Sequence, residues 1–412
     1  MPALDDLKSL LATYKLCNRC LGRQFFYACP WIPTDIKGQI VKKIVYFETA
    51  KNEDTGKECY ICGGLINQLE DIGEKILDKL SEYEFKSYKI GTIFPTDVLE
   101  REDEIRSLIY PMDAASIKVE FNQYLDSFVR NRTKATIDNR DPDVKITVNI
   151  PYNMVHVDVK PIIIAGCYLK YVRNIPQTSW ACRHCNGIGC EACNWTGKEY
   201  GTSIEDLLVN AILPYFEGEK GILHAGGRED VDVRVLGSGR PFALEIISPK
   251  KRNINLEKVE RDVNEKYEGI IGVKGLRYAD KSYISRVKGE MERAVKTYLA
   301  LVKSEEPIDD ASMEKVVNRL KGAIIHQRTP RRVAHRRVDR VRLKRIYDVS
   351  IRRVSENMFK MTVKCEGGTY VKELITGDAG RTKPSVSDIL GLKVECIQLD
   401  VIDIGESNGK EK

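Results

Sequence analysis

Hydrophobic and polar residues follow two different periods along the second half of the chain. Three segments, 201–218, 256–267 and 310–322, place apolar residues three or four positions apart, which predicts helices. Shorter apolar or alternating runs, which predict strands, cover residues 231–236, 240–247, 282–289, 297–302, 345–354, 358–365 and 394–404. Because helices and strands do not alternate regularly, we predict an α+β fold with a mostly antiparallel sheet flanked by helices.

The distribution of cysteines divides the chain into two parts. The protein has 412 residues, a length typical of two or three domains, and ten of its twelve cysteines precede residue 200. We therefore predict one domain over residues 1–197, which carries these cysteines, and a second domain over residues 198–412. Eight of the cysteines fall in close pairs, which favours metal binding over disulfides in a reducing compartment.

The first candidate metal site combines the pairs "CNRC" and "CYIC", which contribute Cys17, Cys20, Cys59 and Cys62. Four thiolates on two tight turns can close a tetrahedron around Zn²⁺. Cys29 is a spare thiol that could replace one of them. The alternative is four buried thiols without a metal, which the repeated pair spacing disfavours.

The second candidate metal site is one short knuckle, "CRHCNGIGCEACNWTG", with ligands Cys182, Cys185, Cys190 and Cys193. A closed four-cysteine zinc site is structural, because it leaves no open position for a substrate. A redox-active C-x-x-C pair is the alternative, and two such pairs around a glycine turn argue against it. His184 lies inside the knuckle and is expected to be a solvated neighbour. We predict one or two structural zinc ions in the whole chain.

Charge points to a nucleic-acid partner. The net charge is +6, and nine Lys or Arg residues lie between positions 328 and 345, with almost no acid among them. Such a run is often only a solvated surface, but arginine binds phosphate in a bidentate manner, which favours nucleic acid. A membrane surface is disfavoured because this basic arm has little apolar face. No apolar run is long enough to cross a bilayer and no signal peptide is recognisable, so we predict a cytoplasmic protein.

The stretch "GGREDVDVR" (226–234) gathers three carboxylates between arginines. If a strand begins at its valines, Asp232 and Arg234 share one face and form an ion pair that braces the strand. Three functions remain open on the residues alone. A metal-dependent nuclease would use Asp232, Glu245 and Lys250. An RNA methyltransferase or thiolation enzyme would need a glycine-rich nucleotide loop before a helix, which "GSGRP" is not. A cofactor-free enzyme would use one Asp as a nucleophile on RNA.

Several motifs together resemble one family. "GRED" followed by "VDVRVLGSGRPFALEI" closely resembles the catalytic stretch of the tRNA pseudouridine synthases called Pus-ten, found in archaea and eukaryotes. "KTYLALV", "GGTYVKELITGDAGRTKPSVSDIL" and "QRTPRRVAHRR" are similar to further motifs of that family, in the same order. "VKPIIIAGCYLKYVRNIPQTSW" resembles the end of its THUMP-containing RNA-binding domain, and "CNRC…CYIC" matches the zinc site of that domain.

The resemblance implies a role for each candidate site residue. Asp230 is the implied catalytic carboxylate, Tyr298 the aromatic residue that stacks on the target base, and Lys372 the cation that holds the Asp ionised. Glu245 is expected to be structural, with Arg240 or Arg228 as its partner. Substrate binding is assigned to Tyr370, Leu390, Arg228, Arg331, Arg332, Arg336 and Arg337.

The implied reaction is isomerisation of uridine to pseudouridine in the T-loop of tRNA, at positions 54 and 55. No cofactor is expected for catalysis, and neither a nucleotide cofactor nor a membrane is expected as a partner. The rival function classes are a zinc-containing RNA-binding protein without catalysis and, further removed, the metal-dependent nuclease.

Overall fold

The computed structural model describes residues 4–46, 59–110, 114–290, 294–335 and 337–405. Its contacts form two compact units: Met1–Lys160 with Ser248–Arg252, and Pro161–Ile247 with Asn253–Lys412. The knuckle of Cys182–Cys193 lies in the second unit, beyond this division. The predicted domain boundary at residue 197 stays a prediction about which parts of the chain fold independently.

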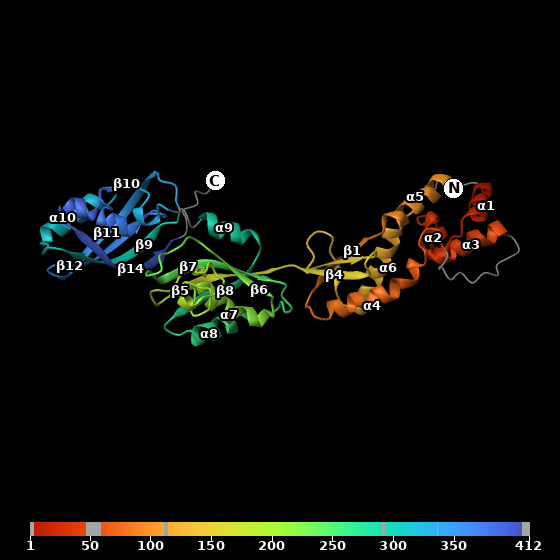
Figure 1. The fold of residues 1–412 in the computed structure, drawn as a ribbon, viewed down its shortest axis with the longest axis horizontal. Helices are drawn as coiled ribbons and strands as arrows, with labels where there is room; N and C mark the ends of the chain where they lie inside the picture. The colour runs from red at the N-terminus through yellow and green to blue at the C-terminus, as the bar shows by residue number, and fades with distance from the viewer. Residues whose placement is uncertain (1–3, 47–58, 111–113, 291–293, 336, 406–412) are drawn as a thin grey trace. The chain divides into compact units, whose positions relative to one another are not determined.

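The first unit packs helices against a small sheet (Figure 1). Its helices are α1 (Leu4–Thr13), α2 (Asn18–Gly22), α3 (Thr34–Tyr46), α4 (Leu69–Leu80), α5 (Thr96–Ile109) and α6 (Ile117–Arg132). Its strands are β1 (Ser87–Ile93), β2 (Thr136–Ile137), β3 (Val144–Asn149) and β4 (Met154–Val159), in the order β2-β1-β3-β4. Strand β1 runs parallel to β2 and β3, whereas β3 and β4 are antiparallel. One apolar core extends from α1 to β3, and the cysteines of the first cluster belong to it.

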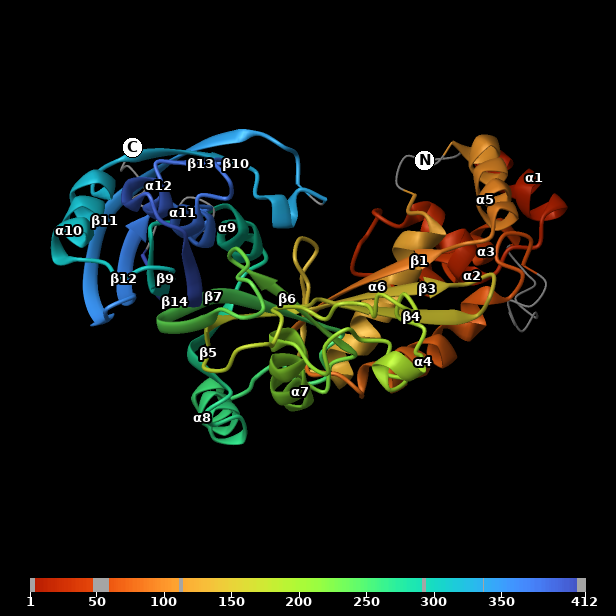
Figure 2. The ribbon, with the colours of Figure 1, turned by 60° about the vertical axis from the view of Figure 1, so that its left-hand side comes forward.

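The second unit is built on a ten-stranded sheet (Figure 2). Its strands are β5 (Ile162–Lys170), β6 (Lys220–Ala225), β7 (Arg234–Ile247), β8 (Ile271–Ala279), β9 (Lys296–Ser304), β10 (Ile324–Arg328), β11 (Val341–Ser355), β12 (Met358–Cys365), β13 (Thr382–Lys383) and β14 (Val394–Ile404). The order is β13-β10-β11-β12-β9-β14-β7-β5-β8, with β6 also paired to β7.

The direction of the strands corrects one expectation. Strand β14 pairs in parallel with the start of β7, while it pairs antiparallel with β9. The small sheet also contains parallel pairs, between β1 and its neighbours β2 and β3. Both sheets are therefore mixed, and the prediction of a mostly antiparallel sheet was wrong. The parallel pair has a consequence for the site, because it joins the two halves of the large sheet where β7 begins.

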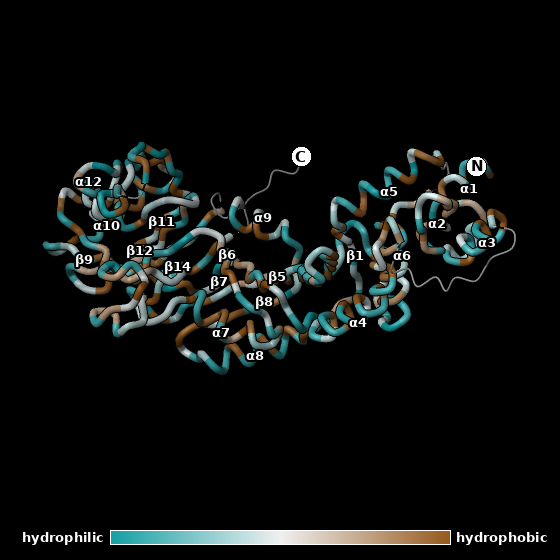
Figure 3. Tube along the Cα trace, turned by 45° about the vertical axis from the view of Figure 1, so that its right-hand side comes forward, coloured by the Kyte–Doolittle hydropathy of each residue, from teal (hydrophilic) through white to brown (hydrophobic). Residues whose placement is uncertain are grey.

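Helices cover the large sheet in three places. These helices are α7 (Ile204–Phe216), α8 (Leu256–Lys266), α9 (Ser282–Glu290), α10 (Asp310–Leu320), α11 (Val371–Thr376) and α12 (Val386–Leu390). Helices α7 and α8 share a core with alternate residues of β5, and α7 is largely brown in the hydropathy colouring of Figure 3. The other face of β5 packs on α9, while α10, α11 and α12 enclose a separate core on β9, β11, β12 and β14. The apolar run of β5 is therefore buried on both faces.

Two of the strand predictions need correction. Residues 282–289 form helix α9 rather than a strand, because Tyr283, Ile284 and Val287 are spaced for one helical face and that face is buried. Strand β7 begins at Arg234 rather than at residue 231. The residues before it form a turn, in which the Val233 backbone N–H donates to the carbonyl of Asp230 at 3.0 Å. Among the described residues, no helix is both long enough and apolar enough to span a bilayer.

Candidate active site

The acidic loop, residues 226–233, connects β6 to β7. Gly227 has a φ of +78°, and a Cβ at this position would lie 3.1 Å from Arg240 Nη1 and 3.2 Å from Lys296 Nζ. A side chain here would meet both an unfavourable backbone conformation and two cations. Glycine therefore allows the loop to lie directly against these side chains.

Glu229 points into the protein. One carboxylate oxygen accepts a hydrogen bond from the Tyr168 hydroxyl at 2.8 Å, and the other lies 2.8 Å from Arg240 Nε. The side chains of Glu229 and Arg240 are only 1% and 2% exposed, and Arg240 also donates to the carbonyl of Gly226 at 2.7 Å. We call Tyr168, Glu229 and Arg240 the buried network. It attaches the start of the acidic loop to strands β5 and β7.

The backbone of the acidic loop is held by donors from residues 170–177. Lys170 Nζ donates to the carbonyl of Val231 at 2.9 Å, and Arg173 donates to that of Asp232 at 2.8 Å. Gln177 donates to the carbonyl of Gly227 at 3.0 Å. Burial lowers the pKa of Lys170 to about 8. Because these carbonyls are capped by side chains from a neighbouring strand and its following segment, the loop has a fixed shape.

Asp230, the next residue after Glu229, faces the other way. Its side chain is 29% exposed, and its nearest cation is Arg332, whose Nη1 lies 2.8 Å from Oδ1. Lys372 Nζ is 3.6 Å from the second oxygen. Arg332 also pairs with Glu373 at 2.6 Å. Burial opposes the charge of Arg332, but the carboxylates of Glu373 and Asp230 outweigh it and raise the pKa of this guanidinium.

Asp232 completes what we call the outer network: Asp230, Asp232, Arg332, Lys372 and Glu373. Lys372 donates to both oxygens of Asp232 at 2.8 Å. Burial opposes ionisation of Asp232, but the Lys372 ammonium outweighs it and lowers the pKa of the carboxyl. The expected pairing of Lys372 with Asp230 is thus present only at the longer distance of 3.6 Å, and Asp232 is the closer partner.

The expected ion pair of Asp232 with Arg234 was wrong. Arg234 instead makes two hydrogen bonds to Asp400 of β14, at 2.9 and 2.6 Å. The cause is the late start of β7: Asp232 stands in the turn, and Arg234 is the first residue paired with the parallel strand β14. Arg173 also contacts Asp400, at 2.6 Å, so this carboxylate joins the sheet to the segment that supports the acidic loop.

Tyr298 lies on β9, paired across the sheet with Val363 and Val401. It packs against the same apolar core as Leu390 of α12. Burial is the largest cause of its raised pKa, and the charge of Asp230 adds a smaller contribution. Tyr298 and Leu390 thus pack against one core of the second unit, the unit that also carries Asp230.

Tyr370 stands at the start of α11. Its backbone is fixed by Gln327 of β10, which accepts from its N–H at 2.8 Å and donates to its carbonyl at 3.0 Å. The Arg332 guanidinium lies 5.9 Å from the centre of the Tyr370 ring. Arginine and aromatic ring therefore meet beside Asp230.

The basic arm is a hairpin in which β10 and β11 pair antiparallel. Its connection brings Arg332, whose side chain is 36% exposed, to the acidic loop, and Arg331 and Arg337 are exposed as well. Arg336 lies outside the described residues. Arg228 is the remaining predicted substrate contact, and its guanidinium lies 4.7 Å from the centre of the Trp180 ring.

The residues proposed for a nuclease do not come together. Glu245 pairs with His224 at 2.9 Å, rather than with Arg240 or Arg228, and Lys250 pairs with Glu82 within the first unit. Within the described ranges, the groups able to hold a metal ion are the two cysteine clusters, with no carboxylate among them. The geometry therefore gives no support to a nuclease.

Both cysteine clusters assemble as their spacing predicts. In each, the four sulfur atoms lie within 4.8 Å of one another: Cys17, Cys20, Cys59 and Cys62 in the first, and Cys182, Cys185, Cys190 and Cys193 in the second. Backbone N–H groups of Gly189, Cys190 and Gly197 donate to sulfurs of the second cluster at 3.2–3.3 Å, which stabilises thiolates. Four converging thiols fit Zn²⁺. Cys29 and His184 are exposed and lie outside these groups.

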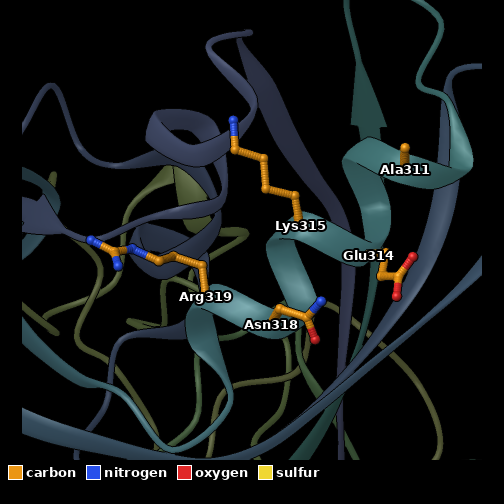
Figure 4. Close-up of a pocket in the computed structure, with 5 residues that line it drawn as sticks. All are labelled: Ala311, Glu314, Lys315, Asn318 and Arg319. Atoms are coloured by element: carbon orange, nitrogen blue, oxygen red, sulfur yellow. The ribbon is translucent and has the colours of Figure 1, made fainter.

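A pocket elsewhere in the second unit lies along one side of α10 (Figure 4). It is lined by Ala311, Glu314, Lys315, Asn318 and Arg319. All five side chains are on the exposed face of an amphipathic helix, and none belongs to the outer or the buried network.

Comparison with known proteins agrees with this architecture. The sequence model described as "Pus10, C-terminal" matches residues 163–405, and the archaeal Pus10 THUMP domain matches residues 72–149. Most of the stretch at residues 159–180 falls within the C-terminal match, and its assignment to the end of the THUMP-containing domain stays a prediction.

Relatives match along most of their length. The tRNA pseudouridine synthase Pus10 of Methanopyrus kandleri is 34% identical over 98% of this chain and 99% of its own, and that of Korarchaeum cryptofilum is 40% identical over 85% and 94%. A crystal structure of a Cbf5–Nop10–Gar1 complex is similar over 58% of this chain and 49% of that chain, at 20% identity and a TM-score of 0.31.

The enzyme class is therefore that of the pseudouridine synthases, which are isomerases. Within this class, the chain belongs to the Pus10 family. The predictions of the family, of a THUMP domain and of an isomerase are confirmed.

Proposed function

We propose that the protein converts uridine to pseudouridine at positions 54 and 55 in the T-loop of tRNA, with Asp230 as its catalytic carboxylate. The observation that carries this proposal is the contrast between neighbouring acids in a chain of the Pus10 family. Glu229 is fully buried in an ion pair, whereas Asp230 is accessible and lies between two cations. Asp230 is thus accessible to a substrate where Glu229 is not, and the choice of Asp230 over Asp232, whose side chain is 50% exposed, rests on the family resemblance.

The reaction suits these side chains. It breaks the N1–C1′ bond, rotates the uracil and forms a C5–C1′ bond, so no group enters and no redox step occurs. The protein must therefore supply an ionised group at the sugar and a surface for the free base. Arg332 and Lys372 lie beside Asp230 and offset its negative charge once the bound base excludes water.

Binding of the target base requires that it leave its stack. This costs a few kcal/mol in a paired region. Stacking on an aromatic ring such as Tyr298 returns about 1–3 kcal/mol per base. Leu390 supplies an apolar wall, and Arg331 and Arg337 of the basic arm, both exposed, contact phosphates, which position an RNA without reading its sequence.

We also propose that each cysteine cluster holds one zinc ion, as a structural element without a role in bond making. Cys17, Cys20, Cys59 and Cys62 would bind the ion of the first unit, and Cys182, Cys185, Cys190 and Cys193 that of the second. Elemental analysis of the purified protein should find close to two zinc ions per chain. Zinc-free protein that folds normally would contradict both assignments.

The function is tested with a T-arm transcript and a full tRNA transcript, in which pseudouridine is mapped by carbodiimide modification. Modification is expected at both positions, and it should persist when divalent ions are chelated from the buffer during a short assay. Transcripts with cytidine at position 54 or at position 55 serve as matched controls that separate the two sites. A protein that binds these transcripts without forming pseudouridine would be an RNA-binding protein instead, and the proposal would be wrong.

A further inference from the structure

The knuckle of Cys182–Cys193 is connected to the acidic loop through one aromatic side chain. Trp180 stands two residues before the first knuckle cysteine, and the guanidinium of Arg228 lies 4.7 Å from the centre of its ring. Arg228 is itself two residues before Asp230. The cation–π contact therefore joins a side chain at the base of the knuckle to the loop that carries the candidate catalytic carboxylate.

Backbone hydrogen bonds between the two ends of the knuckle lie beside Trp180, whose ring also packs edge-on against Tyr200 at 5.7 Å. The Glu199 N–H donates to the carbonyl of Trp180 at 2.9 Å, and the Cys182 N–H donates to that of Gly197 at 2.8 Å. Ala181 and Lys198 form an antiparallel bridge between these two bonds. The two ends of the knuckle are thus tied together directly beside Trp180.

The knuckle has no apolar core of its own, and backbone hydrogen bonds and the ion pair of Arg183 with Glu199 at 2.7 Å support its shape beside the four thiols. Ile188 and Trp195, its large apolar side chains, are 91% and 75% exposed. Cys182 is the buried residue of the segment, at 2% exposure. A segment of this kind without an apolar core gains its structure from metal binding, because the ligands converge only when the ion is bound.

We propose that the Cys182–Cys193 knuckle positions the acidic loop: closed on a zinc ion, it holds Trp180 against Arg228 and so keeps Asp230 correctly placed. The inference deepens the proposed function and rests on it for the role of Asp230. It assigns the knuckle to catalysis indirectly, as a positioning element rather than as a surface for RNA. The exposed acid Glu191 and the anionic thiolates disfavour a phosphate backbone at the knuckle itself.

The experiment uses Trp180 as its own reporter. The chain has three tryptophans, so Trp31→Phe with Trp195→Phe leaves Trp180 as the single emitter. In this parent, Cys185→Ser removes one ligand. We expect Trp180 emission to become more accessible to acrylamide and the single-turnover rate at saturating tRNA to fall at least about tenfold, with tRNA affinity within about threefold of the parent.

Two controls separate positioning from general damage. Ile188→Ser changes the most exposed apolar residue of the knuckle and removes no ligand, so emission, rate and affinity should keep the parent values. In the natural background, Trp180→Phe retains an aromatic ring for Arg228 and should keep most of the rate, whereas Trp180→Leu should lose it. This pair needs no cysteine change, so it tests the contact even if the Cys185→Ser protein folds poorly.

The outcomes distinguish the proposals. Unchanged emission and rate in Cys185→Ser would overturn the inference, and so would equal rates for Trp180→Phe and Trp180→Leu. Weaker tRNA binding with an unchanged rate at saturation would show a surface for RNA instead, which also overturns it. A parent that forms no pseudouridine would refute the proposed function, while the emission of Trp180 would still report whether the knuckle holds it.

Discussion

The buried network and the outer network meet in the same acidic loop, but water reaches only one of them. In the buried network, the side chains of Glu229 and Arg240 are 1% and 2% exposed. In the outer network, those of Asp230 and Arg332 are 29% and 36% exposed. A buried ion pair is costly to break, whereas a partly exposed one exchanges partners at little cost. The first therefore fixes the backbone, and the second can respond to a substrate.

The largest expected effect comes from removing the cation of the buried ion pair between Glu229 and Arg240. Arg240→Met leaves Glu229 buried without its cation, which should lower the free energy of unfolding of the second unit by about 3–5 kcal/mol. Urea unfolding followed by circular dichroism measures this. Adding Glu229→Leu to the same chain is the matched control, because it removes the stranded charge and should recover part of the loss. A cost of less than about 1 kcal/mol for Arg240→Met would mean that the pair does not hold the loop.

The outer network should show the opposite balance between stability and activity. Arg332→Met should cost about 1–3 kcal/mol of unfolding free energy, less than Arg240→Met, because Arg332 is partly exposed while its partner Glu373, at 7% exposure, loses its cation. The single-turnover rate should nevertheless fall about 10- to 100-fold, because Asp230 loses its nearest cation.

Lys372→Met is the matched comparison within the same network. Its rate loss should be smaller than that of Arg332→Met, since Lys372 Nζ is 3.6 Å from Asp230 and 2.8 Å from Asp232. A larger loss for Lys372→Met would restore Lys372 as the main partner of Asp230, as the family resemblance implies.

The last prediction concerns Lys296, a buried cation beside Gly227. Burial lowers its pKa from 10.5 to about 8. Between these two values the unfolded chain binds more protons than the folded one, so its contribution to stability increases as pH rises from about 8 to 10. Lys296→Met should lack this increase, and the difference in unfolding free energy between the two proteins should change by about 1–3 kcal/mol over that range. If the difference in unfolding free energy between the two proteins stays constant from pH 8 to 10, burial does not lower the pKa of Lys296 to about 8.

Sequence patterns were most informative where one short segment decides the structure. The spacing of the cysteines predicted both four-sulfur groups, because a pair separated by two residues sits on a single turn. The helices over 256–267 and 310–322 follow from apolar residues on one face, and α8 and α10 confirm them. Each of these features depends on neighbours within a few turns of the chain.

The buried network could not be predicted in the same way. Glu229 lies 61 residues from its partner Tyr168, and Arg234 lies 166 residues from Asp400. Such pairs depend on which strands become neighbours in the sheet, and the parallel contact of β7 with β14 was not expected. One signal was available in the sequence: Lys170 ends an apolar strand, where a buried cation requires acceptors. It would have directed attention to the backbone carbonyls of the acidic loop.

The most direct test of the account compares the three carboxylates of the acidic loop by single-turnover pseudouridine formation on a T-arm transcript. Asp230→Asn should abolish product while leaving the unfolding free energy within about 1 kcal/mol of the natural protein. Asp232→Asn should retain measurable product, because its carboxylate acts on Lys372 rather than on the substrate. Glu229→Gln should lower the free energy of unfolding, whereas the protein that remains folded should still form product. Product from Asp230→Asn at the natural rate, or a complete loss in folded Asp232→Asn alone, would contradict the assignment of Asp230.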